Sequence, residues 1–307
     1  MTINDFKTNV PLAPYTTLGI GGHADYFFEA RSDEDVVNAV VFAKEKKMPF
    51  AVIGGGSNVL VSDLGFRGLA IITRNNAFEI KDERIRAGAG VPIATLMARC
   101  AKEGYAGLEW AAGLPGTLGG AIVGNAGTFG KSMADVIVDV RVVNEAGEIK
   151  IMSNSECGFG YRTSAFQKMP GVVIVSAQLR VMKGDAQALV EEIKKNAMWR
   201  AEHHPAYKSC GCVFRNTEAT SEARIPQEGN QPVQWFDKVP AGWLVDRAGL
   251  KGAKHGGFTI SDVHGNFFVN DGTGTASDLL ALIAETKRVV KEKFNVELEE
   301  EVRKIGF

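Results

Sequence analysis

The 307-residue sequence has few cysteines, almost no net charge and no long apolar run. Its four cysteines include no CxxC and are too few for a disulfide framework in a chain of this length, so we expect reduced thiols. The formal net charge is −1 and no basic run is present, which argues against nucleic acid or an anionic membrane surface as a partner. No segment approaches ~18 uninterrupted apolar residues and no leader-like start is seen, so we expect a cytoplasmic protein.

Glycine, by contrast, is abundant. The sequence contains 35 glycines, about 11% of the chain against ~7% in ordinary proteins. An apolar fraction of 45% and a charged fraction of 23% are typical of a chain that buries a core, and the length predicts two or three domains. Eight glycines fall within residues 107–130, where we therefore expect no regular helix.

The predicted elements begin in the order β-α-β. A strand over 25–29 precedes Ser32-Asp33-Glu34-Asp35, a capping box that starts a helix ended by Pro49. Strands over 50–53 and 69–72 follow, with a glycine loop between them. Later segments predict, in chain order, a strand from residue 85, a helix over 92–103, a hairpin of 136–144 with 148–152, a strand over 172–181, a helix over 185–200, a surface insertion at 217–239 and a helix over 277–294.

Two glycine loops are candidates for holding an anion. Gly54, Gly55 and Gly56 lack Cβ atoms, so their backbone N–H groups can curl around a phosphate, with Ser57 and Asn58 adding hydrogen bonds; a tight turn is the alternative. The run 112–127 combines glycines with an absence of charge, which permits close approach of a flat or phosphorylated ligand. Two such loops indicate a ligand with a pyrophosphate and a broad ring system, such as a flavin dinucleotide.

A third glycine segment matches the dinucleotide fingerprint only formally. The residues from Gly19 to Ala24 satisfy G-x-G-x-x-G/A, but the motif requires a preceding strand and a following helix, and here a strand follows. We therefore interpret this segment as a glycine-rich turn rather than a Rossmann phosphate loop. Gly88-Ala89-Gly90 is an equally weak match.

Several motifs, taken in order, resemble those of the UDP-N-acetylenolpyruvoylglucosamine reductase family over nearly the whole chain. Each motif is weak or moderate alone, but their joint order is specific. They are Thr16-Thr17 with Ile20-Gly21-Gly22, Ile53 through Asn58, Gly113-Leu114-Pro115-Gly116 through Asn125-Ala126-Gly127, Gly160-Tyr161-Arg162-Thr163-Ser164, Gly211-Cys212-Val213-Phe214-Arg215-Asn216, Ala248-Gly249-Leu250-Lys251-Gly252 and Glu301-Val302-Arg303.

The resemblance implies an α+β fold with two FAD-binding subdomains of the vanillyl-alcohol oxidase type and a C-terminal substrate-binding α+β domain. We expect the first subdomain at 1–70, with the tail 296–307 returning to it, the second at 71–200 and the substrate domain at 201–295. The resemblance also implies NADPH-dependent reduction, through FAD, of UDP-N-acetylglucosamine-enolpyruvate to UDP-N-acetylmuramate in peptidoglycan precursor synthesis. The spacing is similar to that of the shorter, type II members. We expect no metal and no obligate protein partner.

The catalytic residues implied by the resemblance are Arg162, Cys212 and Glu301. Arg162 would stabilise charge that grows beside the substrate carboxylate, although a surface salt bridge is the alternative role for such a residue. Glu301 would assist the reaction either in its protonated form, with a raised pKa, or by holding Arg162 in a tight ion pair. The alternative is that it only belongs to an acidic tail. The family commonly has Ser where this chain has Cys212, and a thiol can also donate the proton; a buried apolar role is the alternative.

The remaining implied site residues bind cofactor or substrate. Zinc at the C-x-C of Cys210 and Cys212 with His203 and His204 is disfavoured, because structural zinc ligands come in spaced pairs. Arg215 replaces a usual lysine, and His264 has a structural role as its alternative. The flavin-binding set is Gly54, Gly55, Gly56, Ser57, Asn58, Gly113, Pro115, Gly116, Gly119, Gly120, Asn125, Ala126 and Gly127, and the substrate-binding set is Tyr161, Arg215, Asn216 and His264.

Two other functions fit parts of the pattern. A flavin oxidase of the same fold, acting on an alcohol or aldose, would lack the pair Arg162 and Glu301 and often carries a covalent flavin. A nucleotide-sugar binding protein without activity would have no reason to keep Arg162, Cys212 and Glu301 together. Bleaching of the flavin by NADPH distinguishes the reductase from both.

Overall fold

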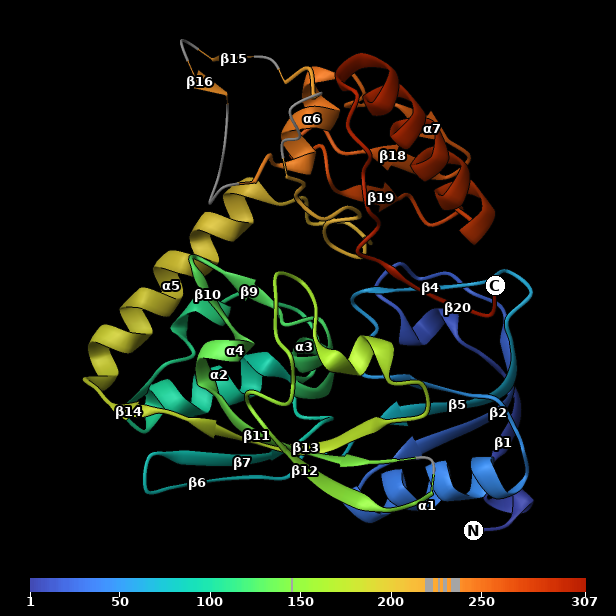
Figure 1. Ribbon diagram of the computed structural model, residues 1–307, viewed down its shortest axis with the longest axis vertical. Helices are drawn as coiled ribbons and strands as arrows, with labels where there is room; N and C mark the ends of the chain where they lie inside the picture. The colour runs from blue at the N-terminus through green and yellow to red at the C-terminus, as the bar shows by residue number, and fades with distance from the viewer. Residues whose placement is uncertain (145, 219–222, 226, 229–230, 233–237) are drawn as a thin grey trace. The chain divides into compact units, whose positions relative to one another are not determined.

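The computed structural model describes residues 1–144, 146–218, 223–225, 227–228, 231–232 and 238–307 (Figure 1). The chain forms two compact units. Unit 1 comprises Met1–Val10, Ala24–Gly55 and Phe66–Arg200, and unit 2 comprises Pro11–His23, Gly56–Gly65 and Ala201–Phe307. The glycine loop at 54–58 is therefore shared, because the chain passes from unit 1 to unit 2 between Gly55 and Gly56. The predicted three-domain division at 70 and 200 stays a prediction.

Unit 1 contains two main sheets. The four-stranded sheet has the order β1 (Lys7–Pro11), β2 (His23–Ala30), β5 (Phe66–Thr73), β3 (Phe50–Ile53), in which β5 is parallel to both β2 and β3. The five-stranded antiparallel sheet has the order β12 (Ile149–Ser153), β11 (Ile137–Val143), β13 (Val173–Arg180), β7 (Arg84–Gly88), β6 (Phe78–Lys81). Two separate two-stranded sheets also lie in unit 1: β8 (Tyr105–Ala106) with β14 (Met182–Lys183), and β9 (Gly127–Thr128) with β10 (Lys131–Ser132).

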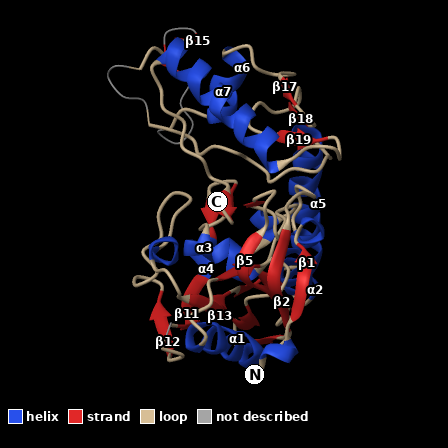
Figure 2. Cartoon of the chain, turned by 90° about the vertical axis from the view of Figure 1, so that its right-hand side faces the viewer, coloured by secondary structure: helices blue, strands red, loops and turns tan. Residues whose placement is uncertain are grey.

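Helices cover both faces of β13. In Figure 2, β11 and β13 lie between α1 (Asp33–Glu45) on one side and α3 (Leu118–Val123) with α4 (Met133–Val136) on the other. Val173 and Val175 pack in the core that contains α1, whereas Ile174 packs in the core that contains α2 (Ile93–Lys102), α3 and α4. The long helix α5 (Ala186–His203) follows. The predicted β-α-β order and the capping box at Ser32, whose Oγ accepts from Asp35 N, are confirmed.

One expectation for the glycine-rich stretch was wrong. Residues 118–123 form the short helix α3 inside the region where no regular helix was expected. Leu118, Ala121 and Ile122 are all buried, and their i, i+3, i+4 spacing places them on one side of the helix, where they pack into the core of unit 1. Burial of this apolar side therefore outweighs the low helix propensity of the intervening glycines.

Unit 2 is built around a long helix and a small sheet. The strands β17 (Lys254–His255), β18 (Phe258–Ile260) and β19 (Phe268–Asn270) form an antiparallel sheet. Residues of β18 and β19 pack in one core with α6 (Ala241–Arg247) and α7 (Ala276–Phe294), and Figure 1 shows these four elements as neighbours. Near the C-terminus, β20 (Arg303–Ile305) pairs in parallel with β4 (Val59–Val61). The C-terminal segment is thus hydrogen-bonded to the strand that follows the 54–58 loop.

The predicted insertion at 217–239 lies in part outside the described residues. Its ends, Thr217 and Val239, form an antiparallel bridge through backbone hydrogen bonds of 3.1 and 2.7 Å, so the two ends lie side by side. The two-residue strands β15 (Gln227–Glu228) and β16 (Gln231–Pro232) pair within it. Within the described ranges, no helix is long and apolar enough to cross a membrane.

Candidate functional site

In unit 1, the start of the first predicted glycine loop, Gly54 and Gly55, lies against the second loop. A Cβ on Gly55 would lie 2.6 Å from the Cα of Gly116, and a Cβ on Gly54 would collide with the Thr117 hydroxyl. Both contacts require glycine at the end of β3, because any side chain there would push the second loop away. The loops, which the sequence presents 60 residues apart, therefore form one surface in unit 1.

This surface carries features that fit a bound anion. The Oγ1 of Thr117 is buried and has no hydrogen-bond partner among the described residues. Gly120, on the next helical turn, is exposed, and a Cβ there would meet only Thr117 Oγ1 at 3.8 Å. A buried hydroxyl without a partner costs free energy unless another group satisfies it. The residues present therefore fit the phosphate of a nucleotide cofactor.

The other predicted cofactor residues of unit 1 have mixed environments. Gly119 is buried, and its N–H donates to Ala89 O at 2.9 Å, so this N–H is used within the protein. Asn125 is 6% exposed; its Nδ2 donates to Gly160 O at 2.8 Å and its Oδ1 accepts from Ala134 N at 3.0 Å. Gly113 has a φ of +71° and Pro115 is exposed. Ala126 N donates to Ala121 O at 2.8 Å, and Gly127 lies in β9.

Arg162 lies in a strained two-residue turn. Gly160 and Thr163 pair across the turn through backbone hydrogen bonds of 3.0 and 3.2 Å, with Tyr161 and Arg162 at its tip. The φ of Arg162 is +53°, a region that side chains other than Gly, Asn and Asp rarely adopt. Its Nη2 donates to Gly127 O at 2.8 Å, and its guanidinium lies 5.4 Å from the ring centre of Tyr161. The turn is thereby fixed to the end of the glycine run.

In unit 2, the backbone brings Cys212, Glu301 and Asn58 to neighbouring positions. Cys212 forms an antiparallel bridge with Phe267, and on the other side of the same segment Glu301 N donates to Val213 O at 2.7 Å. Asn58 Nδ2 donates to Glu301 O at 3.1 Å, while Asn58 Oδ1 is buried with no hydrogen-bond partner in the described chain. Three segments far apart in sequence therefore meet around the predicted proton donor.

The two thiols of the C-x-C differ in environment. Cys210 is buried, and burial raises its pKa to about 12, with the charges of Cys212 and Glu301 also raising it. Cys212 is only partly buried. A thiol whose pKa is raised as far as that of Cys210 is a poor acid and a poor nucleophile, so Cys212 is the better candidate of the two for chemistry. Within the described residues, no group of three His, Cys, Asp or Glu side chains could hold a metal ion.

The predicted substrate residues of unit 2, Arg215, Asn216 and His264, have defined partners. Arg215 Nη1 lies 3.9 Å from Glu299 Oε2. The pKa of Arg303 is lowered, first by burial and then by the positive charge of Arg215. Asn216 Oδ1 accepts from Ala241 N at 3.1 Å, at the start of α6. His264 Nδ1 accepts from the N–H of Asn266 at 3.1 Å; burial, and then Lys251, lower the pKa of this histidine.

Sequence reasoning missed the buried polar residues that hold the site. Asn266 is 1% exposed; its Oδ1 accepts from Phe214 N at 2.9 Å and its Nδ2 donates to Phe214 O at 2.7 Å. It fixes the segment that carries Cys212. Thr117 was also missed, although its place directly after Gly116 in the glycine-rich run was a usable signal. Single asparagines in loops carry no such signal.

Comparison with known proteins finds two matching family models. The FAD binding domain matches residues 24–153, and the C-terminal domain of UDP-N-acetylenolpyruvoylglucosamine reductase matches residues 203–305. UDP-N-acetylenolpyruvoylglucosamine reductase of Solibacter usitatus is 38% identical over 303 residues, covering 98% of this chain and 96% of that protein. UDP-N-acetylenolpyruvoylglucosamine reductase 1 of Bacillus thuringiensis subsp. konkukian is 38% identical over 300 residues, covering 96% and 93%.

A solved structure agrees with the sequence matches. The crystal structure of UDP-N-acetylenolpyruvylglucosamine reductase from Thermus caldophilus superimposes with a TM-score of 0.78 at 31% identity. The match covers 98% of this chain and 99% of that one. The likeness therefore extends to the whole length of both chains.

Proposed function

This chain belongs to the UDP-N-acetylenolpyruvoylglucosamine reductase family, and on that premise we propose how its residues carry the family's reaction. The family's members are FAD-dependent oxidoreductases that use NADPH to reduce UDP-N-acetylglucosamine-enolpyruvate to UDP-N-acetylmuramate in peptidoglycan precursor synthesis. Membership confirms the predicted α+β fold with a flavin-binding part and a C-terminal family domain. The assignment of individual residues is our proposal.

We assign the flavin to the glycine loops. FAD, when bound, takes a hydride from NADPH and delivers it to the methylene carbon of the enolpyruvyl group. The backbone of Gly54, Gly55 and Gly116 and the segment 119–120 would approach the cofactor, with Gly56, Ser57 and Asn58 continuing the first loop. Gly113, Pro115, Asn125, Ala126 and Gly127 complete the proposed set. The partnerless buried hydroxyl of Thr117 supports this assignment, since a phosphate oxygen can accept from it.

We assign catalysis to Arg162, Cys212 and Glu301. As hydride adds to the methylene carbon, negative charge grows on the carbon beside the carboxylate, and the fixed positive charge of Arg162 stabilises it. Cys212 then gives its thiol proton to that carbon, and the resulting thiolate regains a proton from solvent. The observation that carries this assignment is the backbone bond from Glu301 N to Val213 O, which holds the glutamate beside the thiol segment. Tyr161, Arg215, Asn216 and His264 would bind the substrate.

Anaerobic spectroscopy tests the reaction in two halves. NADPH should bleach the bound flavin, and the enolpyruvyl substrate should then restore its colour, with NADH run in parallel to measure the nicotinamide preference. Cys212→Ala should bleach like the wild-type protein but recover colour much more slowly, whereas Cys212→Ser should recover. Failure of either nicotinamide to bleach the wild-type flavin would overturn the proposed function.

We further propose that the enzyme acts in the cytoplasm without nucleic acid and without an obligate protein partner. Its two small substrates, a UDP-sugar and NADPH, need only local binding sites, and a net charge of −1 gives no extended field for a polyanion. Full turnover by the purified chain alone tests independence from a partner. A requirement for a second protein in that assay would contradict it.

A further inference from the structure

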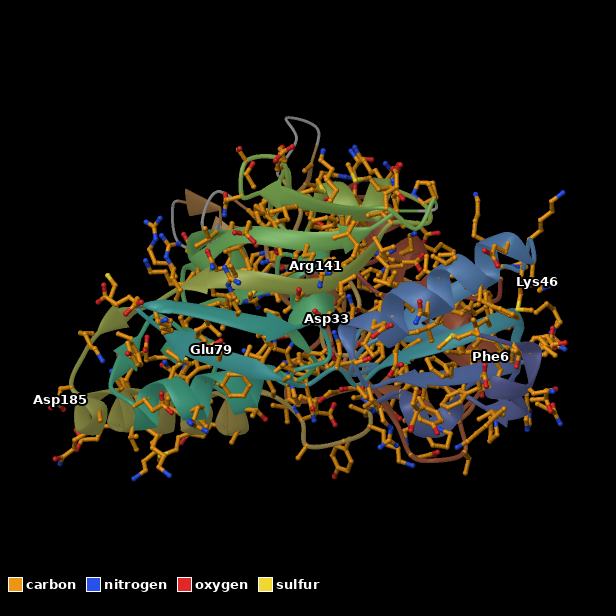
Figure 3. The ribbon with its side chains drawn as sticks, turned by 90° about the horizontal axis from the view of Figure 1, so that it is seen from below. Phe6, Asp33, Lys46, Glu79, Arg141 and Asp185 are labelled. Carbon is orange, nitrogen blue, oxygen red and sulfur yellow. The ribbon has the colours of Figure 1, made fainter. Side chains whose placement is uncertain are left out.

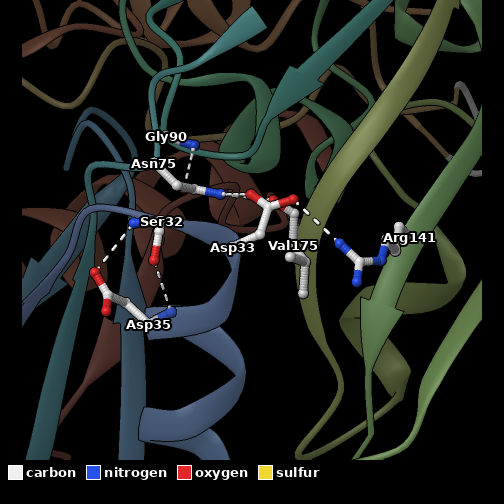
Figure 4. Close-up of polar contacts among 7 residues, drawn as sticks. All are labelled: Ser32, Asp33, Asp35, Asn75, Gly90, Arg141 and Val175. Carbon is white, nitrogen blue, oxygen red and sulfur yellow. Dashed lines mark hydrogen bonds and ion pairs between the residues drawn. The ribbon is translucent and has the colours of Figure 1, made fainter.

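We propose that Asn75 is a positioning residue for residues 116–120, the flavin-binding loop of unit 1. Asn75 lies between β5 and β6, is 2% exposed and forms three side-chain hydrogen bonds (Figure 4). Its Nδ2 donates to Asp33 Oδ1 at 2.8 Å and to Val175 O at 2.7 Å, and its Oδ1 accepts from Gly90 N at 2.9 Å. Every polar group of the amide is therefore used, and its orientation is fixed.

Asn75 also explains the motif Gly88-Ala89-Gly90, which the proposed function leaves unused. A Cβ on Gly90 would lie 2.7 Å from Asn75 N, and a Cβ on Gly88 would collide with Asn75 O. Both glycines are thus needed for the backbone of Asn75 to pass. The glycines of this motif make room for Asn75 of the same chain, so the motif is not a dinucleotide fingerprint.

The segment around Gly90 is hydrogen-bonded directly to the flavin-binding loop. Three backbone hydrogen bonds join the two segments: Gly119 N to Ala89 O at 2.9 Å, Leu118 N to Val91 O at 2.9 Å, and Ile93 N to Gly116 O at 3.1 Å. Residues 116–119 therefore keep their place only as long as residues 89–93 keep theirs. Asn75 fixes the start of that support.

Asp33 holds Asn75 from the other side. It lies in the first turn of α1, and its second carboxylate oxygen accepts from Arg141 Nη1 at 3.2 Å. Figure 3 shows Asp33 and Arg141 as neighbours. Because Asp33 can only accept from Asn75, it selects the orientation in which the amide oxygen points to Gly90. An aspartate at position 75 would instead place two carboxylates in contact.

The inference rests on the proposed function only in taking residues 116–120 as part of the flavin site. The experiment titrates apoprotein of each variant with FAD and measures the dissociation constant by flavin fluorescence, beside the melting temperature without FAD. Asn75→Ala and Asn75→Asp should weaken FAD binding roughly tenfold or more, because Gly90 N or the neighbouring acceptors lose their partner. With FAD saturating, the KM for the enolpyruvyl substrate should change less than about twofold.

Ser32→Ala is the matched control. Ser32 caps the same end of α1, where its Oγ accepts from Asp35 N at 3.0 Å (Figure 4). Its loss should lower the melting temperature of the apoprotein yet leave the FAD dissociation constant unchanged. If Asn75 variants lose FAD affinity no more than Ser32→Ala does at equal loss of melting temperature, Asn75 is merely structural and the proposal fails.

A reciprocal exchange gives a second readout. In the double variant Asp33→Asn with Asn75→Asp, the new amide at 33 can donate to the new carboxylate at 75, which still accepts from Gly90 N. FAD affinity should recover in part relative to Asn75→Asp alone, because Val175 O still lacks the donor that Asn75 Nδ2 provides, and the absence of any recovery would overturn the proposal. These variants also apply if Asn75→Ala does not fold. A wild-type protein that binds no FAD would instead overturn the proposed function, and the inference with it.

Discussion

Gly120→Ala should make the ligand-free protein more stable and the flavin more weakly bound. Gly120 is the third residue of α3, its φ is not positive, and it is exposed. A Cβ there would meet only Thr117 Oγ1, at the ordinary contact distance of 3.8 Å. The protein itself therefore gives no reason for glycine at this position, whereas a cofactor lying against the helix would.

The expected magnitudes have opposite signs. Replacing a helical glycine by alanine stabilises by about 0.5–1 kcal/mol, which raises the melting temperature of the apoprotein by up to roughly 3 °C. A methyl group intruding on a packed ligand costs about 1–3 kcal/mol, which corresponds to a loss of FAD affinity of roughly 5-fold to 150-fold. The rise in melting temperature on adding FAD should shrink accordingly.

Differential scanning fluorimetry with and without FAD measures both effects at once. Gly124→Ala is the control, because Gly124 ends the same helix, and a Cβ there would meet only Gly120 O at 3.7 Å. It should stabilise the apoprotein by a similar or smaller amount and leave FAD binding intact. Wild-type FAD affinity in Gly120→Ala would refute the placement of the flavin on this helix.

Three further outcomes follow from the site residues. N-ethylmaleimide at neutral pH should modify Cys212 first and abolish activity, and the Cys212→Ser variant should resist the reagent. Burial raises the pKa of Cys100 to about 12 and that of Cys157 to about 11, which slows the reaction of those thiols roughly a hundredfold or more. Unchanged sensitivity of the variant would exclude Cys212 as the reactive thiol. Arg162→Lys should fold normally but lower kcat about 10²–10³-fold, since an ammonium cannot keep the fork geometry, and near-normal kcat would place the arginine outside the reaction. Burial lowers the pKa of His264 in the folded protein, so the unfolded chain binds the proton more readily and the stability should fall as the pH drops below about 6.5. The melting temperature of His264→Gln should therefore fall less between pH 7 and pH 5 than that of the wild-type protein. Equal falls in the two proteins would contradict this.

Local patterns in the sequence were sufficient for the regular elements of unit 1. The capping box at Ser32 and the apolar face that follows it predicted α1, and the structure has the helix from Asp33 to Glu45 with that cap. The alternation on each side of Asn144 likewise predicted the hairpin of β11 and β12. These elements are set by contacts between residues close in sequence, so their signals survive in the sequence alone.

The glycine loops show where that reasoning stops. Glycine is required equally where another backbone passes, as at Gly55, and where a ligand would lie, as proposed for Gly120, because both situations forbid a Cβ. The sequence shows a glycine in both cases, and only the three-dimensional structure distinguishes a glycine packed against backbone from one that faces a ligand. The polar supports Asn75 and Asn266 were invisible for a related reason: their partners lie 15 to 100 and 52 residues away.

Arg162 illustrates how backbone geometry adds an argument that is independent of any motif. Its φ of +53° costs an ordinary L-residue roughly 1–2 kcal/mol, and glycine would adopt it freely. The hydrogen bond to Gly127 O and the contact with the Tyr161 ring each offset up to about 1 kcal/mol of this cost. Strain of this kind persists where the side chain serves another purpose. The strained backbone at Arg162 therefore supports the proposal that its guanidinium binds the carboxylate of the substrate.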